Sequence, residues 1–211
     1  GYGSKDNKNN IEKNLNIVVK KIGCEKKNLV ILNQYHSNKV FEVKEPLLKK
    51  LKGDGIFTQK RKVALCILTA DCAPIFLFDK KLNAIGAVHA GWKGVYKNII
   101  DKIIEKFFMI GSKRKDLIGI IGPCIKKNSY EVKSQFVKKF TSKNKKNYRF
   151  FKYKNNKIFF DLTRFIKFQM FKNGIKTVEV IKKDTFDVKN NFFSSRYSKK
   201  KNLMIMVEIY L

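Results

Sequence analysis

The sequence predicts an α/β fold. Short apolar runs of the kind found in buried strands alternate along the chain with segments whose apolar residues recur at helical spacing. A chain of 211 residues with 44% apolar residues, 18 of them Phe, is long enough for a substantial core. We therefore expect one domain that spans residues 1–211.

The first half of the chain predicts one helix followed by strands. Apolar residues recur at helical spacing from Ile11 to Ile22, and Gly23 is a helix stop signal. The following runs are rich in β-branched and apolar residues, and we expect strands at 29–32, 39–43, 63–69, 74–78 and 84–88. Asp54 lies between two glycines, which favours a turn.

The second half predicts two further helices. One opens at Gly91 and carries Val95, Ile99, Ile103 and Phe107 on one stripe. A Gly-rich turn between a strand and a helix presents backbone N–H groups to an anion, and Lys93 would add a charge there. The other helix spans 161–171, with Asp161 as N-cap and an end at 173–174. Strands are expected at 117–121, 157–160, 178–181 and 203–210, and the Lys-rich stretch 133–153 is expected to be mobile and solvated.

The net charge of +30 raises the possibility of nucleic-acid binding. However, 42 of the 47 basic residues are Lys, whereas readers of phosphate and guanine favour Arg. Because the lysines are spread along the chain, we expect only nonspecific adhesion to polyanions at low salt.

The four cysteines, Cys24, Cys66, Cys72 and Cys124, show no C-x-x-C pair, which favours reduced thiols over a disulfide framework. The sequence has no 18-residue apolar stretch and no signal peptide at its start, so we expect a cytoplasmic protein without a membrane span, either a monomer or a homodimer.

His36, Cys72 and His89 are the candidate metal ligands, and they include both histidines of the chain. Each lies at the C-terminal end of an apolar run, where α/β folds place their active sites. Two imidazoles and one thiolate suit Zn²⁺ and leave a fourth position open. A single copper ion is also conceivable with this ligand set, but two histidines are too few for a multicopper site.

A series of motifs in the chain resembles one known family. Gln34-Tyr35-His36 stands where that family has Q-V-H, and Thr69-Ala70-Asp71-Cys72-Ala73-Pro74 resembles its A-D-C-x-P. His89-Ala90-Gly91-Trp92-Lys93-Gly94 is close to H-A-G-W-R-G, with Lys93 in place of the arginine. Further matches are Gly53–Thr58 to D-[AG]-x-x-T, Ile121–Ile125 and Tyr130–Val132 to G-P-x-I and Y-E-V, and Phe192–Arg196 to F-F-S-x-R. The family is the YfiH-like, or laccase-domain, family, long labelled multicopper polyphenol oxidases and now described as purine nucleoside phosphorylases.

The resemblance implies a four-layer α/β/β/α fold with mixed sheets. Family members usually carry a further N-terminal strand and a Gly/Ser/Arg-rich loop, which we expect to be absent from the chain as given. The resemblance also implies phosphorolysis of purine nucleosides such as adenosine or inosine, with adenosine deaminase activity in some members. Zinc bound by His36, Cys72 and His89 would lower the pKa of its water to about 7. Zinc deaminases use such an activated water to attack C6 of adenine.

Further site residues are expected around these ligands. Asp71 is a candidate catalytic residue that could orient a histidine or contact substrate, and Asp54 is a substrate-binding candidate if the family match holds. Lys93 and Arg196 are the phosphate candidates, and Trp92 could stack on a purine, although a lone Trp at such a junction is more often core.

Two other functions stay open. Cys72 could act as a nucleophile with a histidine as its base, in a metal-free hydrolase that acts on a cell-wall precursor. The chain could also be a non-catalytic, basic nucleic-acid-binding protein.

Overall fold

The computed structural model describes residues 7–45, 51–200 and 207–210. Its helices are α1 (Lys8–Ile22), α2 (Trp92–Tyr96), α3 (Ile99–Met109), α4 (Ser134–Lys143), α5 (Leu162–Lys172) and α6 (Ser195–Lys200). Short 3₁₀ segments are η1 (Lys26–Asn28), η2 (Arg114–Asp116), η3 (Lys145–Phe150) and η4 (Val188–Asn190).

The strands form three sheets. They are β1 (Leu29–Ile31), β2 (Val40–Glu42), β3 (Gly55–Thr58), β4 (Ala64–Thr69), β5 (Ala73–Asp79), β6 (Ala84–Ala90), β7 (Leu117–Ile121), β8 (Glu131–Val132), β9 (Phe151–Lys154), β10 (Lys157–Phe160), β11 (Thr177–Val180) and β12 (Val207–Tyr210). The strand orders are β11-β7-β5-β6-β3-β2, β1-β4-β12 and β8-β10-β9. The first two sheets contain both parallel and antiparallel pairs, so they are mixed as the resemblance implied.

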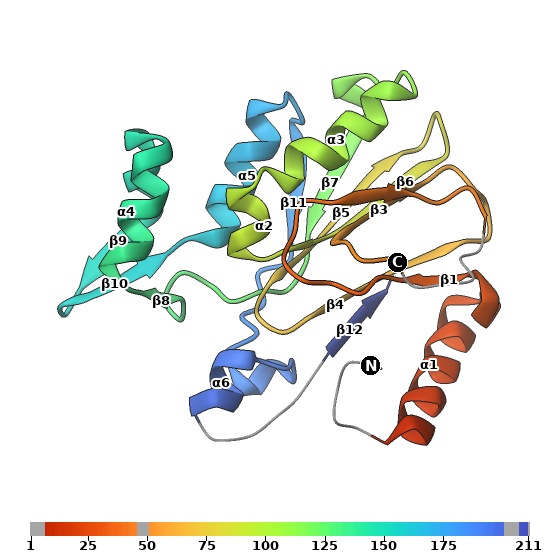
Figure 1. Ribbon diagram of the computed structural model, residues 1–211, viewed down its shortest axis with the longest axis horizontal. Coiled ribbons are helices and arrows are strands. Elements are labelled where there is room, and N and C mark those ends of the chain that lie inside the picture. The colour runs from red at the N-terminus through yellow and green to blue at the C-terminus, as the bar shows by residue number, and fades with distance from the viewer. Residues whose placement is uncertain (1–6, 46–50, 201–206, 211) are drawn as a thin grey trace.

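Four layers stack in the order α1, the β1-β4-β12 sheet, the six-stranded sheet, and the helices α2, α3 and α5 (Figure 1). Alternating side chains of β5 explain why the six-stranded sheet is covered on both faces. Ile75 and Leu77 pack into the core beneath the helices, whereas Phe76 packs into the core between the two sheets. The predicted α/β/β/α architecture is confirmed.

Most of the predicted elements are present. Helix α1 buries Ile11, Leu15 and Val19 on one face, and it ends at Gly23, whose φ of 68° is left-handed. Asp161 caps α5 by accepting a hydrogen bond from the Arg164 N–H group, as predicted.

One expectation is corrected, one is extended, and one lies partly outside the described residues. The helix expected from Gly91 to Phe107 is two helices, because Asn98 takes a left-handed φ of 63° between α2 and α3. The turn expected around Asp54 leads directly into the buried strand β3, whose apolar residues Ile56 and Phe57 are core. Of the strand expected at 203–210, residues 203–206 lie outside the described part of the chain.

The Lys-rich stretch 133–153 was expected to be mobile, and this prediction is wrong. It contains α4, η3 and most of β9, and together with β8 and β10 these elements make a lobe at the left of Figure 1, here called the α4 lobe. Phe140 and Phe150 point into the core at 1% and 2% exposure. Sequence reasoning missed this helical pattern because lysines lie between the buried aromatic residues and lower the average hydropathy of the stretch.

None of the helices in the described ranges has both the length and the apolar character that crossing a membrane requires.

Candidate metal centre

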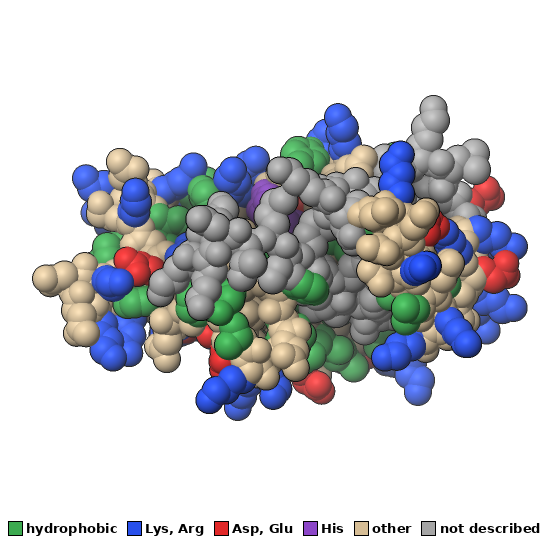
Figure 2. Space-filling view, turned by 90° about the horizontal axis from the view of Figure 1, so that it is seen from below, with side chains coloured by type: hydrophobic (Ala, Val, Ile, Leu, Met, Phe, Trp, Pro, Cys, Tyr) green, Lys and Arg blue, Asp and Glu red, His purple; other side chains and the backbone are tan. Residues whose placement is uncertain are grey.

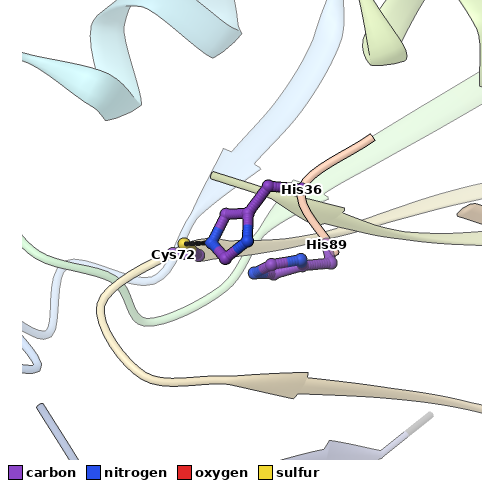
Figure 3. Close-up of side chains that lie close together, drawn as sticks. All are labelled: His36, Cys72 and His89. Carbon is purple, nitrogen blue, oxygen red and sulfur yellow. Dashed lines mark hydrogen bonds between the residues drawn. The ribbon is translucent and has the colours of Figure 1, made fainter. Parts of the chain in front are cut away.

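His36, Cys72 and His89 converge, as the sequence predicted (Figure 3). His36 lies in the loop after β1, Cys72 in the turn between β4 and β5, and His89 next to the end of β6. One ligand atom from each residue lies within 4.8 Å of the others, and the Cys72 Sγ atom is 3.6 Å from His36 Nε2. The two imidazole rings meet edge to face, with their centroids 4.7 Å apart.

The β5–β6 pair brings Cys72 and the end of β6 together. Pro74 pairs with His89 and Ala73 with Ala90, so the residues just beyond, Cys72 and Gly91, approach each other. A Cβ atom at residue 91 would lie 2.7 Å from Cys72 Sγ and 2.8 Å from a ring carbon of His36. Only glycine fits there, because any side chain would occupy the space beside the ligand atoms.

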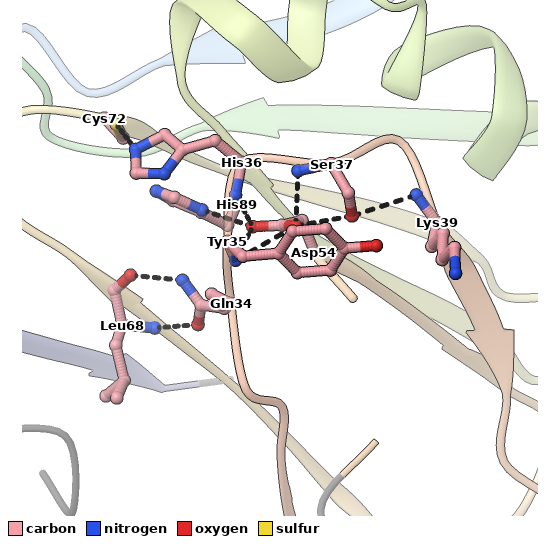
Figure 4. A network of polar contacts seen from close by, with 9 residues as sticks. All are labelled: Gln34, Tyr35, His36, Ser37, Lys39, Asp54, Leu68, Cys72 and His89. Atoms are coloured by element: carbon pink, nitrogen blue, oxygen red, sulfur yellow. Dashed lines mark hydrogen bonds and ion pairs between the residues drawn. The ribbon is translucent and has the colours of Figure 1, made fainter. Parts of the chain in front are cut away.

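Asp54 organises the network that holds both histidines (Figure 4). The backbone N–H groups of Tyr35, His36 and Ser37 donate to its carboxylate, and so does the Ser37 hydroxyl group at 2.6 Å. His89 donates from Nδ1 to Asp54 Oδ1 at 2.8 Å. This bond fixes the tautomer of His89 and leaves Nε2 free to face Cys72 and His36.

Asp54 is fully buried, at 0% exposure. Its oxygens are used by the loop 35–37 and by His89, so the carboxylate contacts the ligand-bearing segments. This arrangement differs from the direct substrate contact expected from the sequence.

The charges of the site favour a Cys72 thiolate paired with a protonated His89, and His89 must lose its Nε2 proton when a metal ion binds. Burial alone would raise the pKa of the Asp54 carboxyl, but hydrogen bonds from His89 and Ser37 lower it to about 2. Burial would likewise raise the pKa of the Cys72 thiol, but the charge of His89 and the hydrogen bond with His36 lower it to about 7. Burial would lower the pKa of His89, yet the Cys72 thiolate and Asp54 raise it to about 9. A thiolate, the form that binds metals, is therefore accessible near neutral pH.

Two residues at the site have left-handed backbone: His36 with a φ of 63° and Asp71 with a φ of 81°. Such conformations are costly for residues other than glycine, and surrounding contacts must hold them. For His36 those contacts are the bonds to Asp54. Gln34 also anchors this loop, because its amide group donates to the Leu68 carbonyl and accepts from the Leu68 N–H group of β4.

Asp71 ties the Cys72 turn to the C-terminal part of the chain. One carboxylate oxygen accepts a hydrogen bond from the Thr185 hydroxyl group at 2.9 Å, and the other accepts one from the Arg196 N–H group at 2.8 Å. The Asp71 carbonyl accepts from the Ile125 N–H group. The Asp71 carboxylate thus holds the start of α6 against the metal centre.

Arg196 and Trp92 line a cleft of about 590 Å³ next to the metal centre, here called the aromatic cleft. The residues that line it are Trp92, Tyr130, Glu131, Val132, Lys133, Gln135, Phe136, Lys139 and Arg196. The Arg196 guanidinium lies over the Tyr130 ring and donates to the Glu131 carbonyl. Lys93 is exposed, and its Nζ atom lies 5.8 Å from the centre of the Trp92 ring. The structure thus brings Trp92, Lys93 and Arg196 to one side of the site.

The three ligands fit a metal ion such as zinc. The donor set is two imidazole nitrogens and a thiolate, and Asp54 provides the carboxylate–histidine contact that is common around metal-binding histidines. Gly91 leaves room beside the ligand atoms. No other group of three His, Cys, Asp or Glu residues in the described part of the chain could hold a metal.

Comparison with known proteins agrees with this geometry. Residues 1–207 match the family described as multi-copper polyphenol oxidoreductase laccase. The chain belongs to this family. Both of its histidines are at the single metal centre described here, so the chain lacks the imidazoles that the multicopper description requires.

Curated relatives in the family carry a different name. The chain is similar to proteins named purine nucleoside phosphorylase from Rickettsia prowazekii (38% identical, covering 81% of this chain and 71% of the relative) and Aquifex aeolicus (36%, covering 72% and 68%). A Campylobacter jejuni protein of the same name is 32% identical and covers 86% of this chain and 76% of the relative.

Solved structures share the fold. The YfiH protein of Bacillus licheniformis superposes with a TM-score of 0.90 at 22% identity, over 100% of this chain and 83% of that one. YlmD of Geobacillus stearothermophilus gives 0.88 at 19% identity, over 100% and 82%.

Sequence reasoning missed several residues that shape the site. Ser37 and Gln34 hold the His36 loop through side-chain bonds, and their only signal was their position beside the Q-Y-H motif. Lys133 and Lys139 line the aromatic cleft, but nothing in the sequence distinguishes them from the other lysines.

Proposed function

We propose that the chain is a purine nucleoside phosphorylase that acts on adenosine or inosine and uses a zinc ion held by His36, Cys72 and His89. The observation that carries this proposal is the converged ligand set in a chain that is 38% identical to a protein named purine nucleoside phosphorylase. Free thiols at the site suit the reducing cytoplasm, where we expect the enzyme to work.

In the proposed reaction, an oxygen of phosphate bonds to C1′ of the ribose as the bond from C1′ to N9 of the purine breaks. The products are ribose 1-phosphate and the free purine, which leaves with a proton. Arg196 and Lys93 bind and orient the phosphate, and Trp92 stacks on the base. When bound, zinc supplies a Lewis acid and lowers the pKa of coordinated water.

Asp54 and Asp71 have positioning roles in this proposal. Asp54 fixes His36 and His89, and Asp71 places the backbone of Arg196 at the site. Neither carboxylate needs to touch substrate, because each is already used by protein donors.

The test is product analysis with adenosine and inorganic phosphate. We expect free adenine and ribose 1-phosphate from the intact, metal-loaded chain, and a loss of at least about a thousandfold in turnover for Cys72→Ala and for His89→Ala. Cys24→Ala is the matched control, because this thiol lies just beyond the end of α1 and is not one of the three candidate ligands. Undiminished turnover in Cys72→Ala would falsify the assignment.

Three protein ligands would leave a fourth zinc position open, which also suits adenosine deamination. Ammonia release from adenosine in the absence of phosphate measures this deaminase activity separately.

The contact of Cys72 Sγ with His36 Nε2 at 3.6 Å supports a second candidate, a cysteine hydrolase. In that mechanism a histidine, His89 or His36, takes the thiol proton, Cys72 attacks an amide or ester carbonyl, and the amine or alcohol leaves with that proton. This candidate predicts a released amino acid from a cell-wall precursor and full activity after treatment with a chelator.

A further inference from the structure

We infer that the aromatic cleft binds the phosphate ester of a purine nucleotide, with Lys133 and Lys139 as its anion-binding residues. This inference rests on the proposed function only for the identity of the base. It assigns a role to side chains outside the family motifs and widens the substrate class from nucleosides to nucleoside monophosphates.

The size of the cleft argues for more than a free phosphate ion. Its volume of about 590 Å³ lies within the range of roughly 300–1,000 Å³ typical of sites for drug-sized organic ligands. An inorganic phosphate would leave most of this space, including the aromatic walls, without contacts.

The charge of the cleft argues for an anion. Lys133, Lys139 and Arg196 line it, against the single lining carboxylate of Glu131. That carboxylate is paired with Lys157 at 3.0 Å, which leaves the three lining cations in excess. Arg196 binds the phosphate co-substrate in the proposed reaction, so Lys133 and Lys139 are the lining cations that remain to neutralise a phosphate ester.

The aromatic rings argue for a planar group beside the anion. Trp92 packs on Phe136 with ring centroids 5.1 Å apart, and the Lys139 Nζ atom lies 5.5 Å from the centre of the Trp92 ring. Arg196 is held over Tyr130 and by the Glu131 carbonyl, so its remaining N–H groups are pre-oriented. Rigid rings flanked by cations are the combination that binds bases and phosphates together.

Two residues that line the cleft, Trp92 and Arg196, are linked to the segments that carry the candidate metal ligands. Trp92 follows Gly91, which abuts Cys72 and His36. Arg196 donates its backbone N–H group to Asp71, which precedes Cys72. A nucleotide in the cleft would therefore extend toward the metal ligands.

Trp92, the one tryptophan of the chain, provides a direct test. Its fluorescence, excited where adenine does not absorb, is followed while the intact chain is titrated separately with AMP, adenosine and inorganic phosphate. No titration contains both a nucleoside and phosphate, so phosphorolysis does not interfere, and an ammonia assay of the adenosine sample checks that deamination has not consumed the ligand. We expect AMP to bind about tenfold more tightly than adenosine.

The double variant Lys133→Gln/Lys139→Gln should remove most of this preference, lowering AMP affinity roughly fivefold to tenfold while adenosine affinity stays the same. Lys13→Gln/Lys20→Gln is the control: it removes the same charge from exposed positions on α1, at the opposite end of the molecule (Figure 1). The control should keep the preference for AMP.

Three results would overturn the inference. They are equal affinities for AMP and adenosine, an equal loss of AMP affinity in the α1 control, and phosphate binding that depends on Lys133 and Lys139 without any preference for AMP. The last result would assign the cleft to free phosphate. Because binding is measured without turnover, an absence of adenosine phosphorolysis would refute the proposed function and leave this inference standing.

Discussion

The metal centre and the α4 lobe are built from different interactions. At the metal centre, one buried carboxylate, Asp54, accepts hydrogen bonds from three consecutive N–H groups, a hydroxyl group and a histidine. In the α4 lobe, aromatic rings pack on one another, and Phe136 stacks on Phe140 with centroids 4.7 Å apart. The α4 lysines Lys139 and Lys143 are exposed and lie over the rings of Trp92 and Tyr96.

The two regions show two kinds of stabilisation: directional hydrogen bonds at the metal centre, and buried apolar surface in the α4 lobe. Hydrogen bonds place a ligand atom to a fraction of an ångström, which suits metal binding. Ring packing supports a surface whose charges remain exposed, as at Lys133, Lys138 and Lys139. Figure 2 shows cationic side chains scattered around the edge of one face of the molecule. Substitutions in the α4 lobe should therefore change mainly stability, whereas substitutions at the metal centre should change mainly metal affinity.

The largest expected effect on stability is in the α4 lobe. Phe140 is 1% exposed, so Phe140→Ala should lower the free energy of unfolding by about 3–5 kcal/mol, through lost contacts and a cavity. Thermal melting of the purified variant measures this.

Tyr153→Ala is the comparison within the same lobe. Tyr153 is 50% exposed, so its truncation should change stability by no more than about 0.5 kcal/mol. Equal melting temperatures for the two variants would mean that the rings do not hold the lobe together.

Removal of the metal should have the next largest effect. With free zinc at 100 times its dissociation constant, binding stabilises the folded chain by about 2.7 kcal/mol, and a chelator should remove that contribution. Calorimetric melting with and without chelator measures the shift. A melting temperature insensitive to the chelator in wild type, or equally sensitive in Cys72→Ala, would show that His36, Cys72 and His89 do not bind metal.

A smaller effect is expected from Asp54→Asn. The variant keeps the shape of the side chain but loses the charge that orients His89, so zinc affinity should fall roughly 10- to 100-fold. Competition with a fluorescent zinc chelator measures this affinity.

Asp116→Asn provides the matched control for that experiment. Asp116 pairs with Lys81, an exposed residue away from the metal centre, and such surface pairs contribute little to stability. Zinc affinity in this variant should equal that of wild type. If both variants bind zinc normally, Asp54 does not position the ligands.

The sequence by itself determined much of the fold. Its apolar runs predicted strands such as β7 and β10 with their observed bounds, because a buried strand must be apolar wherever it lies in the fold. It failed for α4 itself, where helical burial is carried by Phe136 and Phe140 among lysines, a pattern that average hydropathy hides.

The sequence also predicted the candidate metal ligands, which the structure brings together. Two histidines and one cysteine in motif positions left few alternatives, and the β5–β6 pairing then brought two of the ligand segments together. Only the tertiary structure decided that Asp54 holds the ligands from a fully buried position and that Lys133 and Lys139 meet Trp92 at one cleft. The physical reason is that these arrangements depend on contacts between segments far apart in the chain, whereas a residue's own neighbours in sequence carry no record of them.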